Sequence, residues 1–164
     1  MSRFRRMLFT AALSCATTAV SAQDWQLVKD EEGIQVYLAT VPGSSYKAYR
    51  GVTTIKASIE RLRSLQEDVL TSCQWIFQCQ EQKMLKSEGA QSWMDSRFST
   101  PWPVAPRDSV LHITTSVAAD GTLRRQIQAL PDYVPVRDGL VRVSRVDGYW
   151  SLTPKLGGVV EVVY

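Results

Sequence analysis

The side chains that could carry acid–base or nucleophilic chemistry are few and scattered in this 164-residue sequence. His112 is the single histidine, and its alternation with Leu111 and Ile113 predicts that it points away from the core. No serine-hydrolase elbow, zinc-protease helix or phosphate-binding loop is present. The carboxylates form no evident pair, and Asp95 or Glu161 would have to serve if the protein were an enzyme. The residues therefore favour a binding protein over a hydrolase.

Residues 1–22 have the pattern of a secretory signal peptide. Three arginines precede an apolar run, and a small-residue cleavage site ends at Ala22. That run is shorter than the roughly 20 residues that a membrane span needs. We therefore expect a signal peptide over 1–22 and one mature domain over 23–164. The domain would be exported to the periplasm or secreted.

The formal charge of +3 belongs entirely to the predicted signal peptide, which carries three arginines and no acidic residue. Removing these three from the 19 basic residues leaves 16, which equals the 16 acidic residues. No excess of positive charge remains to attract nucleic acid or an anionic membrane over long distances. We therefore expect no nucleic-acid partner.

Two cysteines remain in the mature chain, Cys73 and Cys79. Because an exported protein meets an oxidising compartment, a disulfide is the first interpretation. Free buried thiols are the second. A metal site comes a distant third, since the chain has one histidine and no second cysteine pair to complete a zinc site.

A period of two runs through most of the chain and predicts β-strands. The expected strands span 34–39, 46–57, 91–99, 109–117, 123–130, 140–146, 149–153 and 159–164, with a further strand that begins at Trp75. Turn signals separate them, among them Asp147-Gly148. Consecutive strands joined by short turns predict an antiparallel meander.

One segment has a helical period instead. Ser58 is an N-cap candidate, and behind it Ile59, Leu62, Leu65 and Val69 recur at spacings of three and four. We expect a short amphipathic helix laid on the sheet, whose apolar stripe is either core or pocket wall. One short helix cannot cover the whole apolar face of such a sheet, so a cavity or a missing element is expected.

The stretch PWPVAPRD, at 101–108, interrupts two of the expected strands. Its three prolines fix φ and remove backbone donors, so the segment cannot lie inside a sheet. Trp102 stands between two of them, and Arg107 and Asp108 then enter the next strand with side chains on opposite faces. The stretch is interpreted as a structural corner or, alternatively, as the rim of a pocket.

The chain resembles a bacterial START domain, the lipid-transfer module named after steroidogenic acute regulatory protein. The resemblance runs from Trp25 to Tyr164 and rests on fragments in order: LVKDEEGIQVY (27–37), VPGSSYKAYRG (41–51), CQW (73–75), PWPVAPRD and GLVRVSRVDGYWSLTP (139–154). It implies an α+β helix-grip fold, in which a curved antiparallel sheet grips a long C-terminal helix around a hydrophobic tunnel. It also implies binding of a lipid, sterol or other apolar small molecule, and no cofactor.

Eight residues are candidates for the wall of that tunnel, with ordinary core packing as the competing interpretation of each. They are Tyr49, Trp93, Trp102, Leu111, Ile113, Arg125, Ile127 and Trp150. Sterol-binding family members carry a buried arginine on the strand that follows the Arg-Asp pair, where this chain has Leu111 and Ile113. Arg125 is then a candidate substitute, unless it extends to the surface. The alternative function is a cyclase or hydrolase of the wider helix-grip superfamily.

The last residues, VVEVVY at 159–164, still have a strand pattern where the family's gripping helix should follow. We therefore expect a START domain that is incomplete at its C-terminus, with an open apolar groove that holds lipid weakly. Self-association through the exposed last strand and transient membrane contact are further expectations.

Overall fold

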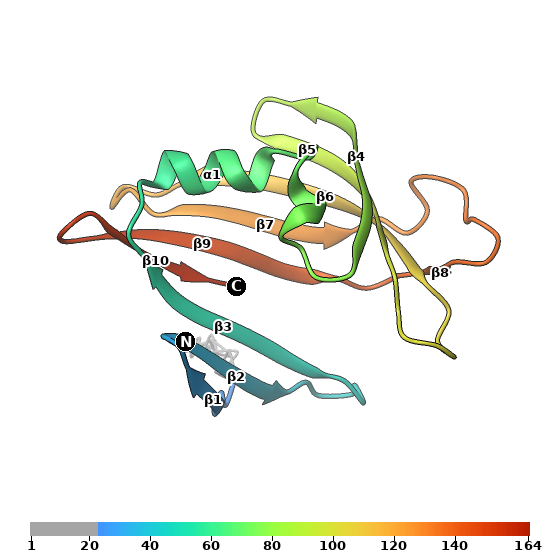
Figure 1. Cartoon of the computed structure of the whole chain (residues 1–164), viewed down its shortest axis with the longest axis horizontal. Coiled ribbons are helices and arrows are strands. Elements are labelled where there is room, and N and C mark those ends of the chain that lie inside the picture. Colours follow the sequence, from blue (N-terminus) through green and yellow to red (C-terminus); the bar gives the residue numbers. More distant parts are fainter. Residues whose placement is uncertain (1–22) are drawn as a thin grey trace, which may run out of the picture.

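The computed structural model describes residues 23–164, so the predicted signal peptide lies outside the described residues. Figure 1 shows a curved sheet with one α-helix lying across it. The elements are β1 (Gln26–Glu31), β2 (Ile34–Thr40), β3 (Lys47–Ile55), α1 (Ile59–Glu67), the 3₁₀-helix η1 (Ser72–Gln74), β4 (Cys79–Glu88), β5 (Gln91–Phe98), β6 (Arg107–Val117), β7 (Leu123–Ala129), β8 (Val141–Arg142), β9 (Asp147–Lys155) and β10 (Val159–Val163). Within this part of the chain, no helix is long and apolar enough to cross a membrane.

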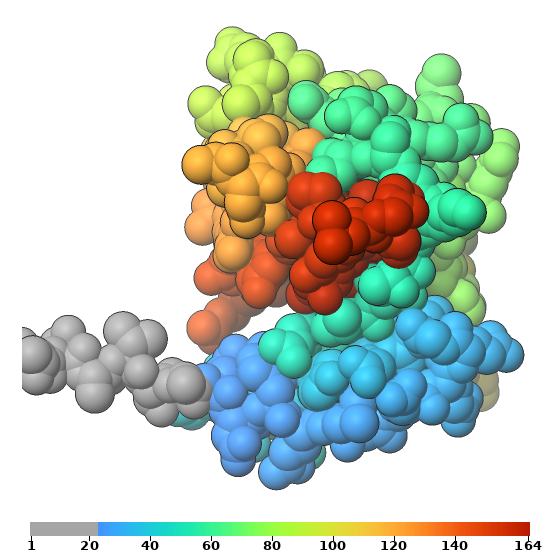
Figure 2. Space-filling view, turned by 90° about the vertical axis from the view of Figure 1, so that its left-hand side faces the viewer, coloured from blue at the N-terminus to red at the C-terminus, as the bar shows by residue number. Residues whose placement is uncertain are grey.

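The sheet has the strand order β1-β2-β3-β10-β9-β7-β6-β5-β4, and all of these neighbours are antiparallel. The predicted meander is confirmed for β4 to β10, with β8 lying off the path beside β6 in parallel. The last strand, β10, closes the arrangement by pairing Val162 with Thr53 of β3. Figure 2 shows the red C-terminal hairpin between the green α1 segment and the blue strands β1 and β2.

Helix α1 defines the inner face of the sheet. Ser58 caps the helix as predicted, with its hydroxyl oxygen accepting from the Arg61 N–H at 3.2 Å. Ile59 and Leu62 pack on buried aliphatic residues of three strands. These residues are Leu123 of β7, Leu152 of β9, and Val160 and Val162 of β10. Burial of this cluster holds α1 over one end of the inner face.

The outer face of β5 and β6 is also covered. Residues 130–142 of the connection between β7 and β9 pack across it and re-enter the sheet as β8 beside the start of β6. Val146, at the end of the connection, packs instead on the inner-face residues Met94, Ile113 and Ile127. Asp108 is only 1% exposed and accepts hydrogen bonds from Arg142 (Nε at 2.9 Å, Nη2 at 2.8 Å) and from Arg137 (Nη1 at 3.0 Å). Arg137 also binds Asp95. We call these four residues the acid–arginine cluster.

The acid–arginine cluster and nearby backbone hydrogen bonds hold the proline corner in place. Asp108 faces outward and finds its partners on residues 130–146, while the backbone of that connection also bonds to the corner. The Val141 N–H donates to the Pro106 carbonyl at 2.9 Å, and the Val143 N–H donates to the Asp108 carbonyl at 2.8 Å. These contacts fit the interpretation of the corner as a structural element.

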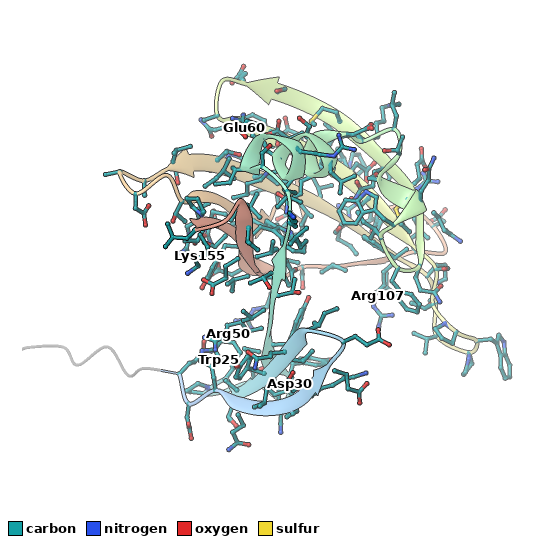
Figure 3. All side chains as sticks on the ribbon, turned by 60° about the vertical axis from the view of Figure 1, so that its left-hand side comes forward. Trp25, Asp30, Arg50, Glu60, Arg107 and Lys155 are labelled. Atoms are coloured by element: carbon teal, nitrogen blue, oxygen red, sulfur yellow. A yellow bond between two sulfur atoms is a disulfide. The ribbon has the colours of Figure 1, made fainter. Side chains whose placement is uncertain are left out.

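At the other edge of the sheet, Arg50 of β3 lies over two aromatic rings. Its guanidinium carbon is 4.4 Å from the centroid of Tyr37 and 5.2 Å from that of Trp25 (Figure 3). Such cation–π contacts help to hold the exposed strand β1 against its neighbours. Strand β1, whose residues are all exposed, was not predicted from its sequence pattern.

Three predicted strand or turn boundaries are wrong, because the backbone dihedral angles or strand pairing differ from the prediction. Trp75 does not begin a strand: η1 ends at Gln74, Gln78 has a left-handed φ of 59°, and β4 begins only at Cys79. The predicted strand 140–146 is reduced to the two residues of β8, because only these pair with the start of β6. Asp147-Gly148 is no turn, because both residues pair with β7 as the start of β9.

Candidate functional site

A cavity of about 520 Å³ opens between α1, the segment 75–77 and the inner face of the sheet. Small-molecule sites in proteins commonly have volumes of roughly 300–1,000 Å³. Strand register builds its floor: Met94 of β5 pairs with Leu111 of β6, and Ile113 of β6 pairs with Ile127 of β7. Since alternate residues of a strand share a face, these four side chains lie together on the inner side. These four floor residues are aliphatic or thioether, and the polar side chains of Gln82 and Ser109 also line the cavity.

Three aromatic rings form one wall of the cavity. Trp150 of β9 lies next to Tyr164, with ring centroids 4.6 Å apart, and Tyr164 lies next to Tyr49 of β3 at 5.4 Å. The two tyrosine hydroxyl groups are 3.3 Å apart. Burial raises the pKa of Tyr164, and the hydrogen bond with Tyr49 raises it further, so the phenol is neutral at physiological pH. The wall is thus uncharged.

A disulfide-closed ring forms part of the mouth. Cys73 and Cys79 are bonded, with Cα atoms 4.9 Å apart, and the segment between them carries Trp75, Ile76 and Phe77 to the cavity. Phe77 is 85% exposed although it touches the cavity. An apolar ring so exposed at a pocket mouth is available to cover a bound molecule.

The comparisons with known proteins assign the chain to a family, although no family model matches the sequence. An uncharacterized protein of Pseudomonas aeruginosa is 49% identical over 98% of this chain and 79% of its own length. The crystal structure of a STAR-related lipid transfer protein from Xanthomonas axonopodis (fragment 25–204) is 36% identical. It has a TM-score of 0.81 and covers 85% of this chain and 78% of that one. The chain belongs to the STAR-related lipid transfer, or START, family.

Human StAR-related lipid transfer protein 5 shares the fold with a TM-score of 0.73, at 15% identity over 85% of this chain and 69% of its own. The predicted α+β helix-grip fold, a curved antiparallel sheet with a short helix on it, is therefore confirmed for this START domain. Among residues 23–164, α1 is the single α-helix.

Six of the eight predicted wall residues lie along the cavity of this START domain. They are Tyr49, Leu111, Ile113, Arg125, Ile127 and Trp150. They come from β3, β6, β7 and β9, and the sheet brings them together although the sequence separates them widely. Their role in ligand binding stays a prediction.

Trp93 and Trp102 do not line the cavity. Trp93 alternates with Met94, so it lies on the outer face, where its ring stacks on His112 at 4.7 Å and on Tyr133 at 6.5 Å. Trp102 is 93% exposed, because the prolines hold the corner outside the sheet. Neither position supports the expectation that these rings form the pocket wall.

The two carboxylates considered for acid–base chemistry also lie elsewhere. Asp95 is held by Arg137 on the outer face, and Glu161 pairs with Lys155 at 3.1 Å. The described lining of the cavity contains no aspartate, glutamate or histidine. In the described part of the chain, no three potential metal ligands come together either.

Several lining residues escaped the sequence-based prediction. Trp75, Ile76 and Phe77 were interpreted as part of a strand, whereas they lie in the loop that the disulfide closes, and all three line the cavity. Tyr164 could have been found, because it alternates with the buried Val160 and Val162.

The cavity contains one cation. Arg125 is 5% exposed, so it does not extend to the surface as the alternative interpretation expected. Its Nη1 donates to the side-chain oxygen of Gln66 at 3.3 Å, while its Nε is buried without a hydrogen-bond partner. Burial lowers the pKa of Arg125, yet a guanidinium remains protonated in proteins.

Proposed function

We propose that this START domain binds a lipid or another apolar small molecule in the cavity between the inner face of the sheet and α1. The observation that carries this proposal is the lining itself: an aliphatic floor beside a wall of three aromatic rings, in about 520 Å³. An apolar ligand would gain about 25 cal/mol for each Å² of surface that it removes from water there. Membership of a lipid-transfer family supports the same assignment.

We propose further that the bound lipid is carried rather than converted. The solved relatives from Xanthomonas axonopodis and from human are named as lipid transfer proteins. The carboxylates that could have supported acid–base chemistry, Asp95 and Glu161, form ion pairs outside the cavity. A carrier needs an apolar cavity and a way in, and the exposed ring of Phe77 stands at the mouth.

The test uses the neutral probe N-phenyl-1-naphthylamine, whose fluorescence rises in apolar surroundings, together with native mass spectrometry of the purified protein. Leu111→Trp should fill the cavity and weaken probe binding at least tenfold. Thr114→Trp is the matched control, because Thr114 is exposed and lies on the opposite face of the same strand. Equal probe binding by both variants, with circular dichroism showing both folded, would overturn the assignment to this cavity.

We also propose that residues 1–22 direct export. The supporting observation is the arginine-led apolar run that ends at Ala22. N-terminal sequencing of protein from the periplasm or medium should begin at Gln23. Recovery of only the full-length chain, inside the cell, would contradict the export proposal.

A further inference from the structure

Arg125 is an unusual residue for an apolar cavity. A buried cation normally has a carboxylate partner, because desolvation of an isolated charge is costly. Within the described residues, Arg125 takes part in no ion pair; the ion pairs there join other side chains. Its side-chain acceptor is the neutral amide oxygen of Gln66, at 3.3 Å. The guanidinium is therefore buried and has no carboxylate in direct contact among the described residues.

The surroundings of Arg125 supply no substitute for a carboxylate. The charge of Glu67 at the end of α1 attracts Arg125 from a distance, but the Glu67 oxygen accepts from Arg63 Nε at 2.9 Å and makes no ion pair with Arg125. Arg63 in turn opposes the attraction that Glu67 exerts on Arg125. One nitrogen, Nε, is left with no acceptor at all.

The position of Arg125 in the sheet places this charge beside the apolar lining. Arg125 of β7 pairs with Trp150 of β9, the first ring of the aromatic wall, and Ile127 of the floor is the next residue on the same face. A ligand that lies along the floor and the wall therefore has one end next to the guanidinium. The cavity has an apolar body and a single cationic end.

We infer that the ligand is a single-chain amphiphile with a carboxylate head, such as a long-chain fatty acid, and that Arg125 binds this head. A planar carboxylate matches the paired N–H donors of a guanidinium, and its one negative charge would supply the direct ion-pair partner that Arg125 lacks. Gln66 holds the arginine from α1, so the head lies under the helix and the chain runs toward the mouth. This inference rests on the proposed function, because it assumes that the cavity holds the lipid.

The experiment compares two probes of equal chain length, oleate and its neutral counterpart oleyl alcohol, in displacement of N-phenyl-1-naphthylamine. The wild-type protein should bind oleate roughly 10- to 100-fold more tightly than the alcohol, the range expected for a hydrogen bond to a charged group. Arg125→Met should remove that preference and leave binding of the alcohol unchanged within about threefold. Arg125→Lys should give an intermediate preference for oleate, since lysine keeps the positive charge but lacks the paired planar N–H donors of a guanidinium.

Arg124→Met is the matched control. Arg124 is the preceding residue on β7, but it lies on the outer face, 3.6 Å from the ring centroid of Tyr149. Its replacement should leave the preference for oleate intact. Equal wild-type affinity for oleate and the alcohol, or an unchanged preference in Arg125→Met, would overturn the inference. Failure of the wild type to bind the dye and both lipids would instead overturn the proposed function, so the two failures are distinguishable.

Discussion

Replacement of Asp108 by asparagine tests whether the acid–arginine cluster fixes residues 130–142 to the outer face. The carboxylate is 1% exposed and accepts three hydrogen bonds, at 2.8, 2.9 and 3.0 Å, from two arginines. Asparagine has nearly the same shape, so the change removes the charge and one acceptor without leaving a cavity. The two guanidinium groups then lose the anion that they share.

The expected loss of stability is about 3 kcal/mol. Removal of one partner from a buried ion pair typically costs about 3–5 kcal/mol. We expect the lower end, because Arg142 keeps the carbonyl oxygens of Val134 and Pro135 as acceptors, at 3.0 and 3.1 Å. Since domains are stable by only about 5–15 kcal/mol, this is a large fraction of the total.

Urea unfolding at pH 7, followed by circular dichroism, measures the effect. With a urea dependence of about 2 kcal/mol per molar, the midpoint should fall by about 1.5 M. The control is Asp138→Asn, an exposed carboxylate in the same connection, which should change the free energy of unfolding by less than about 0.5 kcal/mol. If the free energies of unfolding of the two variants differ by less than about 0.5 kcal/mol, the stabilising role of the acid–arginine cluster is refuted.

The pH dependence gives a second, independent check. The hydrogen bond from Arg142 lowers the pKa of Asp108, with further lowering by the charges of Arg142 and Arg137. A carboxyl group whose pKa is lower in the folded state stabilises the fold fully above its unfolded pKa, about 3.9. This stabilisation is lost as the pH falls through the lower, folded value. The difference in free energy of unfolding between wild type and Asp108→Asn should thus persist at pH 7 and narrow only below about pH 4. A difference that stays constant down to pH 2 would count against the charge mechanism.

Three further changes test the packing, the corner and the disulfide. Leu152→Ala should lower the free energy of unfolding by about 3 kcal/mol in urea, because the side chain is 0% exposed, whereas Leu156→Ala, at 99% exposure, should leave it nearly unchanged; similar values for both would contradict the assigned core. Trp102→Ala should change stability by less than about 0.5 kcal/mol because the ring is almost fully exposed, and a loss above 2 kcal/mol by the same assay would show a packed ring. Cys73→Ser should cost about 2 kcal/mol, the loop-closure estimate for so short a ring. In the wild type, Cys73 and Cys79 should resist alkylation until reduced, and rapid labelling without reductant would exclude the bond.

Much of the sheet could be predicted because a period of two assigns each residue of a strand to one face. Leu111, Ile113 and Ile127 were placed together on this basis, and the register of β6 and β7 confirms their common face. The same rule also predicted that His112 points outward, where its ring nitrogen lies 2.8 Å from Gln91. Local alternation is therefore a sound guide wherever one face of a strand is polar.

The rule failed for Trp93 because both faces of β5 are partly apolar and partly polar. Trp93 shares its face with Asp95, and Met94 shares the other with Ser96, so the pattern alone cannot decide which side is inner. The outer face is buried here by residues 130–142, which join it through contacts between residues 29 and 42 positions apart. Such long-range partners leave no trace in local periodicity.

Arg125 is an intermediate case. The sequence identified it as a candidate anchor on the same face as Leu123 and Ile127, but an arginine at such a position can equally extend to the surface. Only the placement of α1 decides, because Gln66 comes from that helix and covers the guanidinium. The sequence could therefore identify Arg125 as a candidate, but it could not show that this arginine is buried without an ion-pair partner.

The closed ring from Cys73 to Cys79 has a practical consequence for anyone who prepares this protein. The ring fixes both ends of the segment that carries Trp75, Ile76 and Phe77 at the mouth of the cavity. In a host compartment rich in glutathione the two thiols stay apart, and the segment regains the freedom that the bond removes. Batches made in the cytosol and batches made in the periplasm should then differ in how fast a ligand escapes, even with identical sequence and folded sheet. The redox history of each preparation therefore belongs beside every dissociation rate measured on it.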